Sequence, residues 1–448
     1  MRYPLLREGA GRCSASGVRG QSASMTRTKS LPVVMPRVAG QRWACHACAY
    51  CCRELVVSLS AEDRERIDRG GWRERLGVEP YVRLGRKWVL NKTPDGACVF
   101  LDPENRCRLH AEFGEEAKPL DCRRYPFTFR PVGGTWRVGL RFDCPSMARS
   151  QGEPIRQSVS WLRALAPIAP PEKKMCGEDR ARLPGGRRAQ PEEIDVLVDR
   201  FLRWIGREDV PIRRRMIGAA RMTGTLAAAR FKKVRGSRFR ELLDLLFGVI
   251  EREAEKDPRP PAPRQKAMLR QFVFAHAESV SFHEMRRGLG FRLARRFRQL
   301  TDARRFRQGR GIVPPLPGAT GSTSFETVER VRFPKDDTLV DDLCRRYLTV
   351  RLESRTVFGS GFHGWPVVAG LGALWLTVAA AGWLARWHAA CAGRDLCISH
   401  DFVAAMGRID AAATHLPAAG SSAERLRVSY LQEDDGIARL ISVYGPPG

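Results

Sequence analysis

The sequence lacks the short motifs that identify the common classes of enzyme and nucleic-acid-binding protein. It contains no P-loop, no G-x-S-x-G motif, no C₂H₂ zinc finger, no RNA-recognition motif and no helix-turn-helix. His283-Glu284 lacks the second histidine of a zinc-protease motif, and Gly370-Leu371-Gly372 does not follow a strand, as a dinucleotide-binding loop would. No catalytic triad can be assigned either, so the function has to be sought in other features.

The first part of the chain lacks the long apolar segment of a secretory signal peptide. The first apolar run, Leu31–Met35, is short and is broken by Pro32. Residues 1–40 are rich in Arg, Ser and Gly, so we expect them to be disordered, and translation could begin at Met25. Because many thiols have no obvious partner, we expect a cytoplasmic protein.

Acidic residues are too few to balance the basic ones. The chain has 77 Lys and Arg against 49 Asp and Glu, a formal net charge of +28. The densest basic stretches are Ile212–Arg240 and Arg286–Arg310, and both carry apolar residues at helical spacing. Each can be a solvated helix face or a contact for an acidic partner, whereas the missing motifs argue against nucleic acid.

Cysteine is concentrated in one region, which is the most informative feature of the sequence. Four thiols within eight residues are unfavourable unless something binds them, because thiolates repel one another and free thiols oxidise. Zn²⁺ or an iron–sulfur cluster removes both problems. The adjacent Cys51 and Cys52 are expected to point to different centres, or one of them caps a centre that a distant cysteine completes. The candidate metal ligands are Cys45, Cys48, Cys51, Cys52, Cys98, Cys107, Cys122 and Cys144.

Disulfides are the alternative reading of these cysteines. Their number is even, but disulfide frameworks are typical of small secreted chains, and 448 residues can build a large core without them. His46 and His110 neighbour ligand cysteines and could each replace a thiolate. Arg123 and Arg124 could offset the charge of a metal centre or lie on the surface. Four further cysteines are expected to be ordinary thiols: Cys176, Cys344, Cys391 and Cys397.

The spacing of the cysteines resembles that of a known family. C-x₂-C-x₂-C-C from Cys45, followed by Cys98-x-Phe100-Leu101, Cys107-x-Leu109 and Pro119-x₂-Cys122-Arg123-x-Tyr125-Pro126, is similar to the YkgJ-type CxxCxxCC family of zinc- or iron-chelating domains. Within that family, Phe113-Gly114-Glu115-Glu116 and Cys144-Pro145-x₂-Ala148-Arg149 resemble the flagellin lysine N-methylase branch. The resemblance implies metal binding by all eight cysteines. It also implies protein-lysine methylation with S-adenosylmethionine on a flagellin-like substrate, although no motif here maps a methyl-donor site.

The pattern of elements predicts an α+β protein with a small cysteine-rich domain followed by a larger helical one. Short strands are expected at Leu55–Leu59, Lys87–Leu90 and Cys98–Leu101, with a hairpin around Gly133-Gly134. Apolar periodicity then predicts helices, of which Ile194–Ile205 is the clearest. The expected divisions are a disordered segment 1–40, a metal-binding domain 41–150, a helical region 151–310, a Pro/Gly/Ser linker 311–325 and a C-terminal helical region 326–448.

One stretch without charge, Trp365–Ala385, is long enough to span a bilayer. It is rich in Ala and Gly and contains Pro366, so its tendency to insert is weak. We therefore expect a buried core helix and no membrane span.

Two classes of function follow from these observations. In the first, the protein is an enzyme, either a protein methyltransferase or an iron–sulfur redox protein. In the second, a structural metal site supports a helical module that binds a protein or a polyanion. A centre with four thiolates per metal has no open coordination position, which favours a structural or electron-transfer role.

Overall fold

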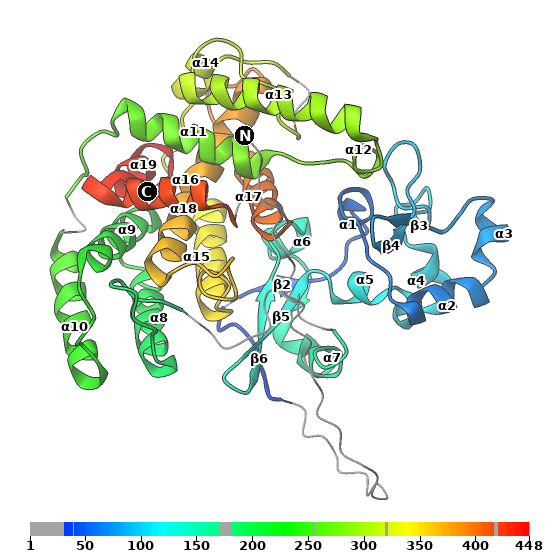
Figure 1. Cartoon of the computed structure of the whole chain (residues 1–448), viewed down its shortest axis with the longest axis horizontal. Coiled ribbons are helices and arrows are strands. Elements are labelled where there is room, and N and C mark those ends of the chain that lie inside the picture. Colours follow the sequence, from blue (N-terminus) through cyan, green and yellow to red (C-terminus); the bar gives the residue numbers. More distant parts are fainter. Residues whose placement is uncertain are drawn as a thin grey trace, which may run out of the picture. The chain divides into compact units, whose positions relative to one another are not determined.

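The computed structural model describes residues 31–447, except for residues 39, 170–180, 254–255, 319–320 and 416–419. Most of the predicted disordered segment 1–40 lies outside the described residues, as do Met25 and Cys176. In the described part, short strands and helices come first and long helices follow (Figure 1). The predicted α+β class is confirmed.

The cysteine-rich part consists of short elements joined by turns. Its strands form three small sheets, in which β1 pairs in parallel with β6, and the pairs β5–β6, β2–β7 and β3–β4 are antiparallel. The elements are β1 (Val33–Val34), β2 (Arg42–Trp43), α1 (Tyr50–Glu54), α2 (Ala61–Arg69), α3 (Trp72–Leu76), β3 (Tyr81–Leu84), β4 (Lys87–Leu90), α4 (Arg108–Phe113), η1 (Glu115–Ala117), α5 (Leu120–Arg124), β5 (Phe127–Val132), β6 (Thr135–Leu140), α6 (Pro145–Ala148), β7 (Glu153–Pro154), η2 (Ile155–Ser158) and α7 (Val159–Leu165).

Local sequence explains several of these elements. The Ser60 hydroxyl accepts from the backbone N–H of Asp63, whose carboxylate accepts in return from the N–H of Ser60, so a capping box starts α2. Gly133 and Gly134 both have positive φ, as the tight turn of the predicted β5–β6 hairpin requires. Two predicted strands are wrong. Leu55–Leu59 and Cys98–Leu101 contain only isolated bridges, Ser58 with Val89, Lys92 with Cys98, and Leu101 with Cys107.

The rest of the described chain is helical. The helices are α8 (Pro191–Ile205), α9 (Ile212–Ala228), α10 (Gly236–Glu253), α11 (Pro263–Ala277), α12 (Phe282–Met285), α13 (Leu289–Gln308), α14 (Phe325–Arg330), α15 (Thr338–Glu353), α16 (Val367–Cys391), α17 (Ser399–His415), α18 (Ser422–Gln432), η5 (Glu433–Asp435) and α19 (Gly436–Tyr444).

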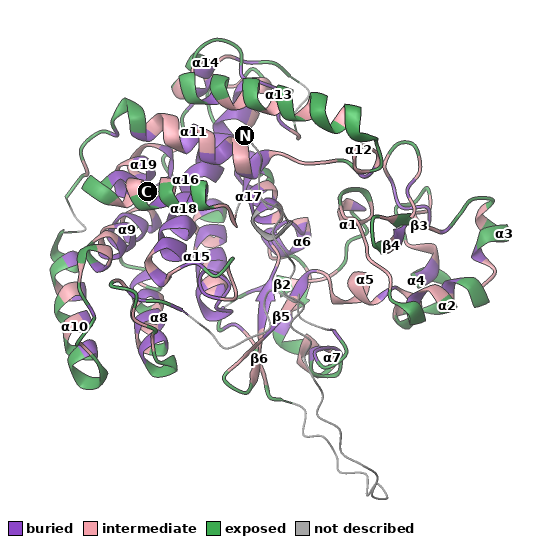
Figure 2. Cartoon of the chain, viewed as in Figure 1, coloured by how far each residue is buried: buried purple, intermediate pink, exposed green. Residues whose placement is uncertain are grey.

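Helix α16 is the centre of the helical part, and α17, α19, α9 and α11 pack around it (Figure 2). Within the described residues it is the one helix long and apolar enough to suit a membrane span, yet 94% of its most apolar window is buried in the protein. Two of its three buried tryptophans donate inside the core, Trp375 to the Thr223 hydroxyl at 2.8 Å and Trp383 to the Glu329 carboxylate at 3.4 Å. The predicted buried helix is confirmed.

The described residues contain two hydrophobic cores. The larger one runs from the β5–β6 hairpin through α6 and α7 to the helices up to α19, and it includes Cys144. The smaller one lies within the cysteine-rich part, around Trp72, Phe100 and Leu109, and it includes Cys98. The two buried candidate cysteines therefore belong to different cores, while the predicted domain boundaries stay a prediction.

Candidate metal centre

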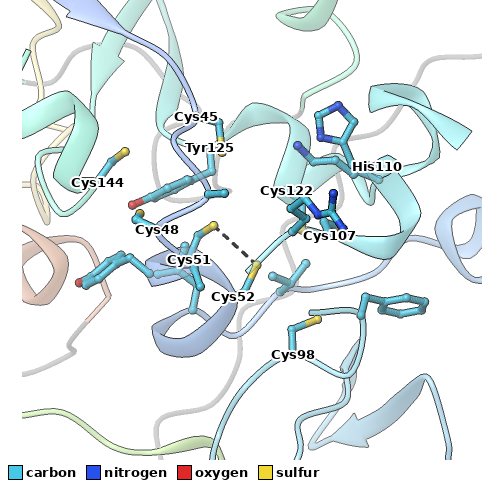
Figure 3. Close-up of a pocket in the computed structure, with 18 of the residues that line it drawn as sticks. Cys45, Cys48, Cys51, Cys52, Cys98, Cys107, His110, Cys122, Tyr125 and Cys144 are labelled. Atoms are coloured by element: carbon cyan, nitrogen blue, oxygen red, sulfur yellow. Dashed lines mark hydrogen bonds between the residues drawn. The ribbon is translucent and has the colours of Figure 1, made fainter. Parts of the chain in front are cut away.

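All eight candidate cysteines line one cavity of about 880 Å³ (Figure 3). They come from positions up to 99 residues apart in the sequence (144 − 45), so the fold places distant thiols in the wall of one cavity, while their binding to a common metal stays a prediction. Cys45 and Cys48 are exposed, Cys98 and Cys144 are buried, and the other four are half-buried. The described cysteines are all free thiols, so the disulfide alternative finds no support among them.

The first four cysteines are placed by a tight loop followed by a single helical turn. In this loop Ala47 and Ala49 have φ of 50° and 56°, in the left-handed region that residues with a side chain seldom adopt. Helix α1 starts directly after Ala49, and it carries both Cys51 and Cys52. The Sγ atoms of these two residues are 3.9 Å apart. The two left-handed residues let the chain turn tightly where these four thiols line the cavity.

Three of the later cysteines lie on turns or at the ends of elements, and Cys122 lies within a short helix. The backbone N–H of Cys98 donates to the carbonyl oxygen of Cys52 at 2.9 Å, which ties the two thiols to neighbouring positions. Cys107 pairs with Leu101 across a turn and is the N-cap of α4. Cys122 lies in the five-residue helix α5, and Cys144 is the N-cap of α6, with proline at the first helical position as predicted.

The thiols form an inner group and an outer group. The Cys122 thiol interacts electrostatically with Cys98, Cys107 and Cys51, and Cys52 packs against the same small core. Cys144 belongs to the larger core, and its thiol interacts with that of Cys48. In Figure 3, Cys51 and Cys52 lie in the middle of the view, between Cys98 and Cys144. We name Cys51, Cys52, Cys98, Cys107 and Cys122 the inner thiols, and Cys45, Cys48 and Cys144 the outer thiols.

Burial makes the buried thiols hard to ionise without a cation. It raises the pKa of both Cys98 and Cys144 to about 12, and it raises the pKa of Cys107 and, more strongly, of Cys122. Backbone N–H groups of His110 and Leu109 partly oppose the effect of burial on Cys107. In the metal-free protein these thiols are therefore protonated at neutral pH.

Two lysines supply positive charge to the cavity wall. Lys92 is buried, which lowers its pKa, although the thiols of Cys98 and Cys52 oppose this effect. For Lys118 burial acts in the same direction, but Glu115 outweighs it, with help from the thiols of Cys122 and Cys107, so that its pKa is raised. Sequence analysis missed both lysines, since neither lies within the cysteine motifs.

The arginines singled out from the sequence lie elsewhere. Arg123 pairs with Glu116 at 2.6 Å and Arg124 with Asp121 at 3.0 Å, and neither lines the thiol cavity. His46 and His110 do line it. The Nδ1 atom of His46 lies 3.0 Å from the hydroxyl of Ser146, and the Nε2 atom of His110 lies 3.6 Å from the carboxylate of Glu115.

The donor set fits a thiolate-bound metal centre. Thiolates are the ligands that structural zinc and iron–sulfur clusters take, and cationic side chains nearby reduce the cost of gathering them. Among the described residues, no three Cys, His, Asp or Glu side chains come close enough to hold one ion as they stand. Binding therefore requires the thiols to turn inward from the cavity wall.

A second cavity of about 750 Å³ adjoins the first. The wall between them contains residues from α1, α5 and the segments that follow α1, β4 and α5: Tyr50, Leu55, Val57, Lys92, Asp121 and Tyr125. Arg141 and Arg408 line the second cavity as well. Its volume is in the range of small-molecule sites, about 300–1,000 Å³.

The cysteine region matches a known family model. Residues 44–146 match the CxxCxxCC family, described as a "Putative zinc- or iron-chelating domain". No curated protein and no solved structure matches the chain. The match supports the family and does not extend to its flagellin lysine N-methylase branch. Residues 44–146 are therefore similar to the CxxCxxCC domain, and this chain carries them in front of a long helical region.

Proposed function

We propose that the cysteine domain holds an iron–sulfur centre, with zinc as the alternative occupant. The observation that carries the proposal is the convergence of eight thiols on one cavity of about 880 Å³. A zinc ion draws four sulfurs to about 2.3 Å and leaves no room between them. A cluster also contains inorganic sulfide and fills more space, so a wide cavity lined by thiols supports a cluster.

Four of the five inner thiols, all except Cys51, are the proposed ligands of the first centre. Cys52, Cys98, Cys107 and Cys122 share the small core, and Lys118 lies beside them. Cys51 then joins the outer thiols to complete a second set of four. A bound cluster would supply electron transfer or a structural cross-link, and the two lysines of the cavity wall would offset its negative charge.

Metal analysis of anaerobically purified protein tests this proposal. We expect brown protein that contains iron and acid-labile sulfide, with charge-transfer absorption in the visible range. Colourless protein with stoichiometric zinc would replace the cluster with a zinc site. Folded protein of full stability that contains neither metal would overturn the proposal.

A pair of cysteine variants locates the centre. Cys122→Ser should lower the metal content and the melting temperature, because small metal domains gain much of their folding free energy from the ion. Cys391→Ser is the matched control, since Cys391 is also half-buried but lies outside the cavity, in the last turn of α16. Equal metal content in both variants would remove Cys122 from the ligand set.

Methyl transfer to a protein lysine is a second candidate function. The resemblance of Cys144-Pro145 and its surroundings to the flagellin methylase branch suggests it, and the second cavity beside the thiols has room for a small methyl donor. Calorimetry with S-adenosylmethionine and transfer of a labelled methyl group to flagellin would test it. No heat and no labelled protein would leave a metal-supported binding module as the remaining function.

A further inference from the structure

A row of large apolar side chains on α13 faces solvent. Leu289, Leu293, Phe297 and Leu300 are 77%, 55%, 69% and 68% exposed. Their spacing of three or four residues places them on one face of the helix. Scattered exposed apolar residues need no explanation, but a continuous row of four indicates a surface that meets a partner.

The opposite face of α13 is fixed to the protein, so the helix cannot turn to bury this row. The Phe306 ring packs against Phe274, with centroids 5.0 Å apart. Arg295 donates to the carbonyl oxygen of Ser279 at 2.8 Å, and Gln299 donates to the Glu278 carboxylate at 2.9 Å. In Figure 2, α13 shows long exposed stretches beside the more buried α11.

The charge of α13 indicates the charge of the surface that it binds. The helix contains seven arginines and a single acid, Asp302. At 100° per residue, Arg296 lies on one side of the apolar row and Arg305 on the other. Both are exposed, and neither forms an ion pair with any residue that the structure describes. The partner is therefore apolar at its centre and anionic around it.

We propose that α13 binds the surface of an anionic lipid bilayer. The helix lies in the plane of the membrane, the apolar row enters between the headgroups, and the arginines contact lipid phosphates. The helix is about 30 Å long and its apolar row runs along its exposed face, with arginines on both sides, which is the arrangement of helices that lie in the plane of an anionic membrane. The proposal does not depend on the metal centre or on α16.

The contributions to binding can be estimated for each kind of residue. Each arginine near an anionic surface raises the affinity about fivefold. Each leucine or phenylalanine of the row raises it about tenfold or more when its side chain leaves water. Binding should therefore need both anionic lipid and the apolar row, and it should weaken as salt screens the charges.

Co-sedimentation of the full chain with vesicles tests the proposal. The vesicles contain either phosphatidylcholine alone or phosphatidylcholine with phosphatidylglycerol. We expect binding to the anionic vesicles and a loss of about a hundredfold or more in the variant Leu293→Glu/Phe297→Glu. Leu426→Glu is the matched control, because Leu426 is 67% exposed on α18, away from α13. Both variants should keep the wild-type melting temperature, since all three side chains face solvent.

Three outcomes would overturn the proposal. The first is no binding to anionic vesicles. The second is binding that the two α13 substitutions leave unchanged. The third is retention on an acidic protein or on heparin, lost in the same variant, without any vesicle binding, which would assign α13 to a soluble polyanion.

Discussion

Replacing Arg346 with methionine should destabilise the protein strongly, because this side chain joins the helical part to the region around Cys144. Arg346 lies on α15, and its side chain is 2% exposed. It donates to the Gln41 amide oxygen at 2.9 Å and to the carbonyl oxygens of Met147 and Ala148 at 3.1 and 2.7 Å. Its Nε donates to the Asp342 carboxylate at 2.6 Å.

The size of the effect follows from these four bonds. A hydrogen bond to a charged group contributes about 1.5–3 kcal/mol, but much of this sum is offset by the cost of burying the guanidinium. Breaking a buried charged network in comparable proteins costs about 3–5 kcal/mol, and we expect this range for Arg346→Met. Because the freed carbonyl groups belong to α6, which starts directly after Cys144, the variant should also bind less metal.

Urea unfolding followed by circular dichroism measures the loss, with Arg345→Met as the control. Arg345 pairs with the same Asp342 at 2.6 Å, but its side chain is 23% exposed and contributes about 1 kcal/mol or less. If both variants lowered the free energy of unfolding equally, Arg346 would not be the link between the two parts.

Three further predictions concern the core and the thiols. Burial lowers the pKa of His276 from 6.5 to about 4, so the folded protein favours the neutral imidazole. The free energy of unfolding that this preference contributes is complete above pH 6.5 and should fall by about 3 kcal/mol as the pH drops towards 4. Unfolding measured at several pH values should show this loss in the wild type and a flatter dependence in His276→Leu. A Cβ at Gly382 would overlap the carbonyl oxygen of Tyr444, so Gly382→Ala should lower the melting temperature. A Cβ at Gly248 in α10 would meet no atom, so Gly248→Ala should raise the free energy of unfolding by about 0.5–1 kcal/mol. Because Cys98 is protonated at neutral pH, metal uptake should release protons in weakly buffered solution and tighten as pH rises; a pH-independent affinity would contradict this.

The elements that the sequence predicted correctly are those set by nearby residues. The helix expected at Ile194–Ile205 ends at Gly206 as α8 does, and the Ser60 cap and the Gly133-Gly134 turn need only their own neighbours. The strands expected at Leu55–Leu59 and Cys98–Leu101 were wrong, because strand pairing depends on partners far along the chain.

The candidate site likewise combines features set by the local sequence with features set by tertiary packing. Cysteine spacing singled out eight thiols that line one cavity, since a metal-binding motif is a pattern in the sequence itself, and their binding to a common metal stays a prediction. It could not show that Cys144 belongs to another core than Cys98, or that Lys92 and Lys118 line the cavity, because both follow from tertiary packing. For α13, apolar periodicity predicted a helix, but only the packing of Phe306 shows which face is left exposed.

Because the cysteines belong to two cores, a bound metal would change how cooperatively the protein unfolds. Cys144 is packed into the larger core, while Cys98 and Cys122 are packed with the smaller one. An ion or cluster that held thiols of both sets would tie together two cores that pack separately within the one compact unit Pro32–Gly448. Removing it should then lower the melting temperature and broaden the unfolding transition, so calorimetric traces would report the state of the centre.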